Sequence, residues 1–252
     1  MELIRITREN IEKEHICCAI SSNKDCQVQS KKAWLTERLD QGLVFLKGDV
    51  RGKCFIEYIP AEYAWAPIEA KGYMYIDCLW ASGQYKGKGY GDSLMEQCIQ
   101  DSKDKGKLGL VCISSKKKMP FLSDPGFMRH KGFKLADTSS PYFELLYLPF
   151  DSEAGVPWVK ACAKDGRIDE MGWVLYYSNQ CPHTEKYAPL LTDIIKGQGM
   201  ECRLHKIDSR EAAQSAPVLF TTYALFYNGK FVTNEVLSEK SFAKLWERIR
   251  ER

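Results

Sequence analysis

The feature that most constrains this chain is the glycine-rich stretch at residues 84–91, QYKGKGYG, which follows a strand-like run and precedes an amphipathic helix. Its glycines alternate with other residues, two of which are lysines. Glycine loses more conformational entropy on folding than alanine, so this cluster indicates an unusual turn or a ligand close to the main chain. Free amides and the dipole at a helix N-terminus favour an anion. The stretch therefore predicts a diphosphate-binding loop, with a simple helix-capping turn as the alternative.

Two common nucleotide-binding motifs do not match this stretch. A P-loop requires GxxxxGK followed by Ser or Thr, which is absent here. A dinucleotide-binding fold requires GxGxxG and an acidic residue about 20 positions further on. The chain has GxGxG instead, and residues 106–111 contain no acidic side chain.

Composition limits the class of protein. A chain of 252 residues can form one large or two modest domains, and 44% hydrophobic and 27% charged residues are typical of a soluble protein. The net charge of +3 gives no reason to expect nucleic acid as a partner. No apolar run is long enough to span a membrane, and the charged N-terminus does not resemble a signal peptide. We therefore expect a cytoplasmic protein with reduced cysteines.

Hydrophobic periodicity predicts an α/β chain whose first part contains strands and helices in alternation. Helices are expected near residues 9–19, 31–41 and 91–105, and a short one before Gly132. Strands are expected at residues 2–6, 43–47, 53–59, 73–80, 108–114 and 141–150. A polar segment with Gly and Pro at residues 151–157 then marks a domain boundary, which divides the chain into residues 1–150 and 151–252.

The second part shows a different pattern. Asn228-Gly229 between two β-rich runs is a strong hairpin signal. Helices are expected from about residue 182 to 196 and from 238 to 250. Strands are expected at residues 173–177, 201–207, 217–227 and 230–233.

The stretch at residues 86–91 resembles the acyl-CoA pyrophosphate loop of the GNAT superfamily of N-acyltransferases. Gly89 and Gly91 match the glycines of that motif, and Lys86 stands where Arg or Gln is usual. The order of elements over residues 1–150 is similar, and Gly132-Phe133 resembles the family's GF pair. The resemblance implies an α/β GNAT fold, with a central mixed, mostly antiparallel sheet flanked by helices.

The same resemblance implies a function. It predicts an N-acetyltransferase that uses acetyl-CoA as a cosubstrate, with no metal, and transfers the acetyl group by direct attack in a ternary complex. The acceptor would be a small-molecule amine or a peptide, and the protein a monomer or homodimer. Backbone groups near Leu79 and Ala81 would hold the pantetheine arm. The pyrophosphate would lie against Lys86, Gly87, Lys88, Gly89, Tyr90 and Gly91.

Acyl transfer to an amine requires a base, and one carboxylate lies on the strand before the loop. Alternation places Asp77 on one face with Tyr73, Tyr75 and Leu79. We expect Asp77 to act as the base or to position the amine, with a capped or ion-paired aspartate as the alternative. Glu57 and Glu62 are competing candidates.

The acid that protonates the leaving thiolate is less clearly indicated. The family often uses a tyrosine four residues before the glycine of the GF pair, and this chain has Met128 there. Tyr142 and Tyr147 are alternatives, unless they are packing residues. The aromatic residues Tyr58, Tyr63, Trp65 and Trp80 either line an acceptor pocket or belong to the core.

The complete chain resembles GNAT proteins that carry a C-terminal YoaP-like region, on the stretch TTYALFYNGKFVTNE at residues 221–235. A strand, then Cys181-Pro182-His183-Thr184, then a helix resembles the start of a thioredoxin-like domain. A thiol at a helix N-terminus favours the thiolate, but Thr184 replaces the resolving cysteine. Cys181 is thus a possible reactive thiol. The alternative function is an acyl-CoA-sensing or thiol-binding protein that uses Cys181. The alternative for the domain is an inert thioredoxin-like module that completes a substrate cleft or a dimer contact.

Overall fold

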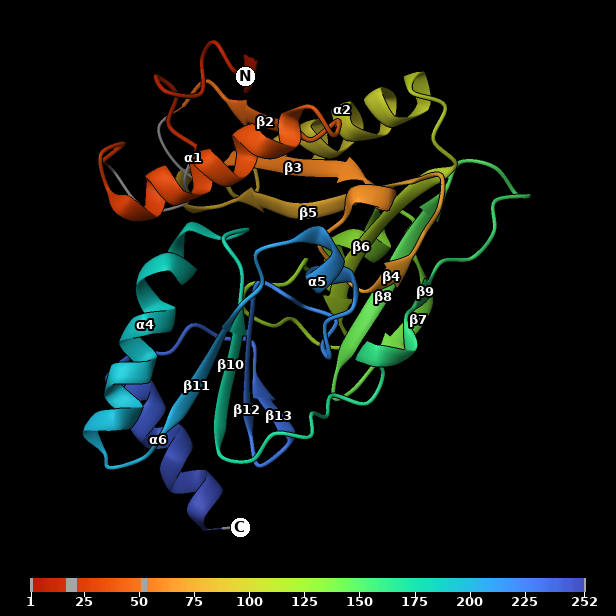
Figure 1. Ribbon diagram of the computed structural model, residues 1–252. Helices are drawn as coiled ribbons and strands as arrows, with labels where there is room; N and C mark the ends of the chain where they lie inside the picture. The colour runs from red at the N-terminus through yellow and green to blue at the C-terminus, as the bar shows by residue number, and fades with distance from the viewer. Residues whose placement is uncertain (1, 17–21, 51–53, 252) are drawn as a thin grey trace.

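A seven-stranded sheet and a four-stranded sheet organise the chain (Figure 1). The computed structural model describes residues 2–16, 22–50 and 54–251. The larger sheet has the order β1-β2-β3-β5-β6-β8-β7, and only β5 and β6 run parallel. Its strands are β1 (Leu3–Arg5), β2 (Val44–Gly48), β3 (Cys54–Pro60), β5 (Tyr73–Ala81), β6 (Gly109–Ser115), β7 (Lys134–Ser139) and β8 (Phe143–Pro149). The mixed, mostly antiparallel sheet expected from the sequence is confirmed.

Helices cover the two faces of this sheet differently. Helix α1 (Cys26–Leu39) starts at Asp25, whose side chain accepts from the Gln27 amide, and buries Trp34 and Leu35 on one face. Helices α2 (Tyr90–Asp104) and α3 (Pro125–His130) cover the other face, where Leu94 and Met128 are buried. Alternate residues of each strand therefore belong to two separate apolar clusters.

The smaller sheet has the order β11-β10-β12-β13, with β10 parallel to β11 and antiparallel to β12. Its strands are β10 (Trp173–Tyr177), β11 (Cys202–Lys206), β12 (Tyr223–Tyr227) and β13 (Lys230–Thr233). Helices α4 (Pro182–Gly197) and α6 (Glu239–Arg250) pack on one face, and the short α5 (Arg210–Gln214) lies toward the other. The expected hairpin is confirmed, with Asn228 and Gly229 at φ 47° and 75°.

The segment between the two sheets packs on the first one. Strand β9 (Trp158–Val159) pairs with β4 (Ile68–Glu69), and Ala163 enters the apolar cluster on the α1 side. The Ser139 hydroxyl donates to the Ala163 carbonyl, and Lys164 forms an ion pair with Asp137. The chain after residue 150 thus remains attached to the first sheet before β10 begins.

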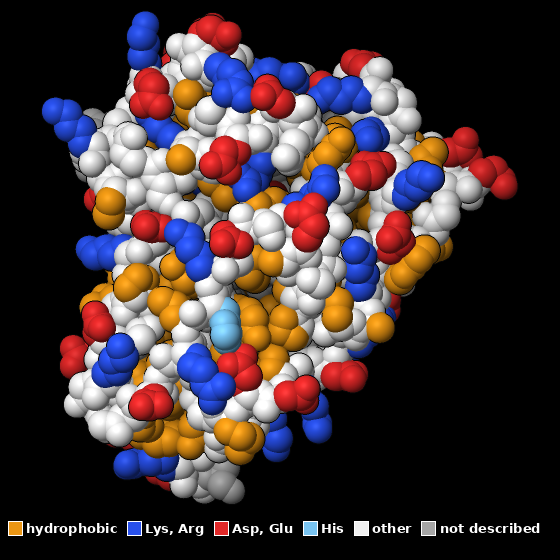
Figure 2. All heavy atoms as spheres, viewed as in Figure 1, with side chains coloured by type: hydrophobic (Ala, Val, Ile, Leu, Met, Phe, Trp, Pro, Cys, Tyr) orange, Lys and Arg blue, Asp and Glu red, His pale blue; other side chains and the backbone are white. Residues whose placement is uncertain are grey.

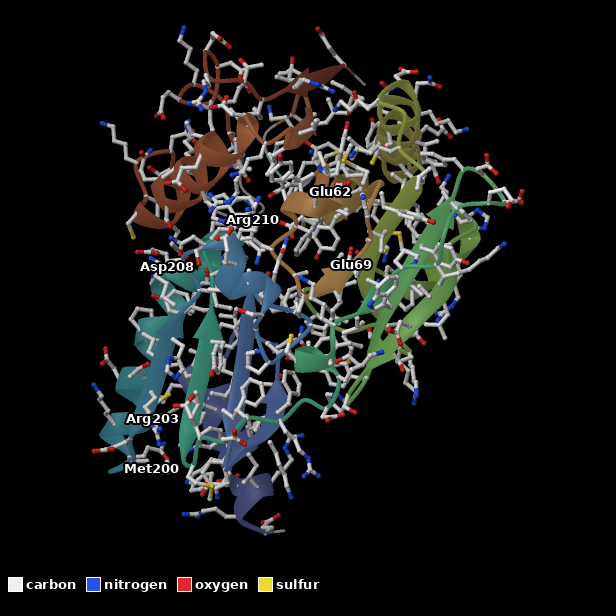
Figure 3. The ribbon with its side chains drawn as sticks, turned by 45° about the vertical axis from the view of Figure 1, so that its right-hand side comes forward. Glu62, Glu69, Met200, Arg203, Asp208 and Arg210 are labelled. Atoms are coloured by element: carbon white, nitrogen blue, oxygen red, sulfur yellow. The ribbon has the colours of Figure 1, made fainter. Side chains whose placement is uncertain are left out.

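We call the part of the chain built on the seven-stranded sheet the first unit and the part built on the four-stranded sheet the second unit. The two units share one apolar core. The cluster that contains Trp34, Tyr75 and Phe143 of the first unit also contains Leu219 and Phe226 of the second. In the view of Figure 2, hydrophobic side chains gather in the middle of the molecule, where the units meet. Polar contacts join the same surfaces: Gln214 of α5 donates to the carbonyls of Glu62 and Ala64. Figure 3 shows Arg210 at the start of α5 beside the segment that carries Glu62.

The structure differs from the sequence expectations in a few elements. The helix expected at residues 9–19 is not formed where the chain is described, since residues 8–13 form turns, and residues 17–19 lie outside the described part. Strand β7 and helix α5 were not predicted. Helix α1 begins five residues before the expected start at residue 31, because Asp25 caps it. No described helix is long and apolar enough to cross a membrane.

Candidate active site

The candidate site lies where strands β5 and β6 part. Their parallel ladder begins at Tyr73 and Gly109 and ends at Ile76 and Cys112, although β5 continues to Ala81. We call residues 77–81 of β5 and 113–115 of β6 the fork. Along the fork β5 still pairs with β3 on its other side, so its outward N–H and C=O groups face β6 without ladder bonds. This edge presents the alternating N–H and C=O groups with which an extended ligand pairs.

A β-bulge inserts Asp77 into β5 at the start of the fork. Glu57 of β3 pairs with Cys78, and the next β3 residue, Tyr58, pairs with Ile76. Asp77 is therefore the extra residue, and a bulge of this kind redirects a side chain. Asp77 and Cys78 both face α1, while Leu79 enters the cluster under α2. The expected shared face of Asp77 and Leu79 is wrong, because the simple alternation ignores the bulge.

The bulge brings the carboxyl group of Asp77 next to that of Glu57. Glu57 is 1% exposed and Asp77 is partly buried. Burial and the neighbouring Glu57 charge raise the pKa of Asp77 well above its usual range, and a hydrogen bond between the two carboxyls adds to this effect. The nearby Lys31 opposes it. Such a carboxyl keeps its proton to a higher pH than an ordinary aspartate does.

Helix α1 places a buried lysine on this carboxyl pair. The Lys31 Nζ atom lies 2.8 Å from both carboxylate oxygens of Glu57 and 2.5 Å from the Gln180 carbonyl of the second unit. Burial alone would lower the pKa of Lys31, but the charges of Glu57 and Asp77 and the hydrogen bond to Glu57 raise it. About two turns further along α1, Arg38 lies over the rings of Trp34 and Trp65.

The glycine-rich stretch forms an exposed turn at the start of α2. Gly87 and Gly89 have φ values of 73° and 79°, in the left-handed region that favours glycine. A Cβ atom at either position would meet nothing within 4 Å, so the space in front of these residues is open. Gly89 is the N-cap and has no side chain to accept from the first amides of α2. The loop therefore fits an anion bound by backbone amides.

The remaining loop residues support this geometry. Lys86 and Lys88 are exposed on the turn, and Tyr90 begins the helix. A Cβ at Gly91 would contact the Phe127 ring at 3.6 Å and the Ala81 side chain at 3.9 Å, so the loop lies beside the end of the fork. The positions expected to hold the pyrophosphate and the pantetheine arm are therefore adjacent.

Tyr142 is tied to the second unit. Its hydroxyl donates to Asn234 at 2.6 Å, and burial raises its pKa to about 12. Asn234 in turn donates to the Pro120 carbonyl. The geometry gives Tyr142 a role in joining the units, and its hydroxyl is already engaged as a donor. Tyr147 lies at the other end of β6, opposite Val111.

The aromatic residues expected to line an acceptor pocket are divided between the two faces. Tyr58 faces α2, where its hydroxyl donates to Asp101 and burial raises its pKa. Trp65 and Trp80 belong to the α1 side, with Tyr63 packed there beside Arg210. Glu62, a competing base, accepts from the Gly72 amide and pairs with Lys107, away from the carboxyl pair.

Cys181 caps helix α4 next to this site. It follows Gln180, whose carbonyl accepts from Lys31, and it is partly buried. The Thr184 hydroxyl donates to the carbonyls of Ser178 and Cys181 within the same turn. Thr221 donates to the Trp65 carbonyl and accepts from the Gln180 side chain. The Cys181 turn is thus fastened to the first unit.

The sequence analysis missed Lys31 although a signal was present. Val28, Lys31 and Leu35 are spaced by three and four residues, so a lysine occupies the apolar stripe of a helix. A buried lysine requires a partner, which here is Glu57. Among the described residues no group of three or more His, Cys, Asp or Glu is arranged to hold a metal ion, and Cys17 and Cys18 lie outside them.

Two family models match the chain. The acetyltransferase (GNAT) family model matches residues 8–119, which include β5, the loop and α2, and the YoaP-like model matches residues 202–244. An uncharacterized N-acetyltransferase, YoaP of Bacillus subtilis, is 43% identical over 243 residues, which cover 96% of this chain and 97% of that protein. The similarity to this relative therefore extends across both units.

Solved structures show weaker similarity. A ribosomal-protein-alanine N-acetyltransferase from Brucella melitensis is 14% identical and covers 58% of this chain and 97% of its own, with a TM-score of 0.41. PaiA N-acetyltransferase from Thermoplasma acidophilum, in complex with coenzyme A, is 16% identical. It covers 60% of this chain and 100% of its own, with a TM-score of 0.40.

Proposed function

Since this chain belongs to the GNAT acetyltransferase family and is an N-acetyltransferase, we propose that it transfers the acetyl group of acetyl-CoA directly to an amine, with Asp77 as the base. The observation that carries this proposal is the bulge, which places the Asp77 carboxyl at the start of the fork and beside Glu57. A general base is most effective when its pKa lies near the operating pH, and the pKa of Asp77 is shifted upward, in that direction.

The loop and the fork would hold acetyl-CoA. The pyrophosphate fits the open space in front of Gly87 and Gly89, where amides of the α2 N-terminus and the exposed Lys86 and Lys88 attract negative charge. The pantetheine arm would bond to backbone groups of residues 79–81, on the edge of β5 where the ladder with β6 has ended. This orientation points the thioester toward Asp77, which precedes these residues on the same strand.

The chemistry asks little more of the protein. The amine nitrogen attacks the thioester carbonyl, the C–N bond forms, the C–S bond breaks, and CoA leaves as a thiolate. Ionised Asp77 takes the proton that the attacking nitrogen loses and later releases it to solvent, while the thiolate takes one proton from solvent. The net products are the amide and the CoA thiol, and Asp77 is ionised again. Tyr142 is not assigned the second step, because its hydroxyl donates to Asn234.

We assign the acceptor to the α1 side of the sheet, and the two units to different tasks. The first unit, residues 1–150, would bind acetyl-CoA and carry the base. The second, residues 151–252, would cover the acceptor side, since its Gln180 and Thr221 contact Lys31 and Trp65 there. A small amine or a peptide N-terminus suits a site with two carboxyls and several aromatic rings.

The experiment is a two-substrate kinetic analysis of the full-length chain. Acetyl-CoA is combined with a panel of primary amines and short peptides, and release of the CoA thiol is followed together with the mass of the acetylated product. Direct transfer predicts intersecting initial-velocity lines and no acetylated enzyme. Parallel lines with an acetyl group on Cys181 would instead support the thiol as the reacting group. Calorimetry with acetyl-CoA, and with NADH as a control, tests the loop independently of the acceptor.

A further inference from the structure

Lys31 connects the candidate base to the second unit. Its ammonium group, on a side chain that is 4% exposed, has two partners that are far apart in the sequence: Glu57 on β3 and the Gln180 carbonyl. The face of the Trp34 ring lies 4.2 Å from the same nitrogen. A buried ammonium requires such partners, so its position depends on both units.

The charges around Lys31 balance only when one proton is present on the carboxyl pair. Lys31 compensates the charge of Glu57, and ionisation of Asp77 adds a second negative charge to a buried site. Arg38 contributes from about two turns further along α1, but it pairs with Glu37. The titratable or charged groups that face the site are Lys31 and Arg38 from α1, Glu57 from β3, Tyr75, Asp77 and Cys78 from β5, and, beyond Ser30, Glu185 from α4.

The second unit holds its side of this contact firmly. Gln180 is 6% exposed, and its side-chain amide donates to the hydroxyls of Ser178 and Thr221. The Thr221 hydroxyl in turn donates to the Trp65 carbonyl of the first unit. The carbonyl that accepts from Lys31 is therefore part of a connected set of hydrogen bonds across the junction.

We propose that Lys31 is a positioning residue of the active site, which holds Glu57 as the partner of Asp77 and is itself held by the Gln180 carbonyl. The second unit thereby completes the catalytic arrangement and does not merely cover it. This inference rests on the proposed function, in which Asp77 is the base, but its geometry is independent of the acceptor.

The test titrates Asp77 in the full-length chain by 13C NMR of labelled aspartate carboxyls, with Asp77→Asn to assign the signal. Lys31→Met should raise the titration midpoint of Asp77 by roughly 1–3 pH units, because the cation that offsets the two carboxyls is lost. Lys31→Arg should keep the midpoint close to that of the wild type. If Lys31→Met does not fold, Lys31→Gln removes the same charge and replaces it in the titration.

Lys32 provides the matched control. It is also buried on α1, at 1% exposed, but its Nζ atom donates to the Glu12 carbonyl. Lys32→Met should leave the Asp77 midpoint unchanged. Equal midpoints in Lys31→Met and Lys32→Met would overturn the proposal, whereas full activity of Asp77→Asn would overturn the proposed base and leave this titration interpretable.

The contact between the units has its own readout. Hydrogen exchange of peptides that cover residues 178–184 should be faster in Lys31→Met than in Lys32→Met, because the Gln180 carbonyl loses its partner across the junction. Identical exchange in both variants would show that the second unit does not depend on Lys31 and would overturn that part of the inference.

Discussion

Two turns of this protein each connect a strand to a helix, but one is exposed and the other is buried. Strand β5 leads through the glycine loop into α2, and β10 leads through residues 178–181 into α4. Neither helix has a side-chain hydrogen bond at its N-cap, which is Gly89 in one and Cys181 in the other. Residues 86–89 are exposed, whereas Ser178, Gln180 and Thr184 are buried.

The difference shows that a helix N-terminus becomes a binding site only through its surroundings. In the first turn, left-handed glycines leave open space in front of the amides. In the second turn, Pro182 removes one amide, and the carbonyl of Gln180 binds Lys31. The first turn is therefore suited to an incoming anion, and the second to joining the two units.

The largest expected effect comes from replacing the candidate base, on the strand that leads into the first turn, and the thiol of the second turn. Asp77→Asn should lower the rate of acetyl transfer by roughly 10²–10⁴-fold, the usual contribution of a general base, with little change in acetyl-CoA affinity. Cys181→Ser should retain most of the activity. Steady-state rates and calorimetry on both variants measure this. A loss of activity in Cys181→Ser, with full activity in Asp77→Asn, would place the chemistry on the thiol of the second turn.

The next effect concerns the loop itself. Gly89→Val should weaken acetyl-CoA binding by roughly 100-fold or more, because a side chain would fill the space that the diphosphate needs and strain a residue with φ of 79°. Gly106→Val, at the other end of α2, introduces similar strain at φ 65° with equally open surroundings. The dissociation constant of Gly106→Val for acetyl-CoA, measured by the same calorimetric titration, should remain that of the wild type. Equal weakening in both variants would point to strain alone.

The pH dependence of acetyl transfer provides a third test, on the strand that leads into the first turn. Activity should rise with pH as Asp77 loses its proton, and the midpoint should lie well above the ordinary aspartate pKa of about 3.9. Glu57→Gln removes the neighbouring charge that raises this pKa, so the rise in kcat/KM should move to lower pH. A pH profile that is the same in Glu57→Gln and the wild type would separate Asp77 from its expected partner.

The same pKa shift predicts a change in stability with a definite sign. Because the pKa of folded Asp77 is raised, the folded state binds a proton that the unfolded state has released. The contribution of Asp77 to stability is therefore lost as pH rises from the ordinary aspartate range through the raised pKa. Asp77→Asn should flatten this part of the curve of unfolding free energy against pH, as measured by urea denaturation.

The smallest expected effect tests the second turn. Thr221→Val should cost roughly 1–3 kcal/mol of stability, because the buried Trp65 carbonyl and the Gln180 amide each lose a partner. Thr192→Val is the control, since its hydroxyl bonds only inside the second unit among the contacts of the described residues, to the Ala188 carbonyl of α4 and to Cys202 of β11. Urea unfolding of both variants measures the difference. Equal losses would mean that the junction hydrogen bonds add nothing beyond those of an ordinary buried threonine.

Much of this fold could be predicted from local patterns, because most strands and helices bury an apolar side. Residues 173–177 and 230–233 were bounded correctly, and the ends of β5 and α2 differ by about one residue. Strand β7 was missed because it is a short, largely exposed sequence, KLADTS, with no apolar alternation. Helix α5, REAAQ, is too short for helical periodicity to show.

The candidate site could be predicted only in part, for a physical reason. The loop and Asp77 were visible in the sequence because glycines and a lone carboxylate stand out against their neighbours. The pairing of Asp77 with Glu57 depends on the bulge, which results from the register of two strands and has no local signature. The contact of Lys31 with Gln180 joins residues 149 positions apart, which no pattern along the chain reveals.

The bulge has a consequence for how such a site can be gained or lost. Without Asp77, the residues that flank it would alternate regularly: Tyr75 and Cys78 face α1, and Ile76 and Leu79 face α2. The strand therefore accommodates the candidate base as one additional residue, while every neighbour keeps the side of the sheet it would otherwise have. In the gene, this strand and a regular strand without Asp77 would differ by a single codon, inserted in frame.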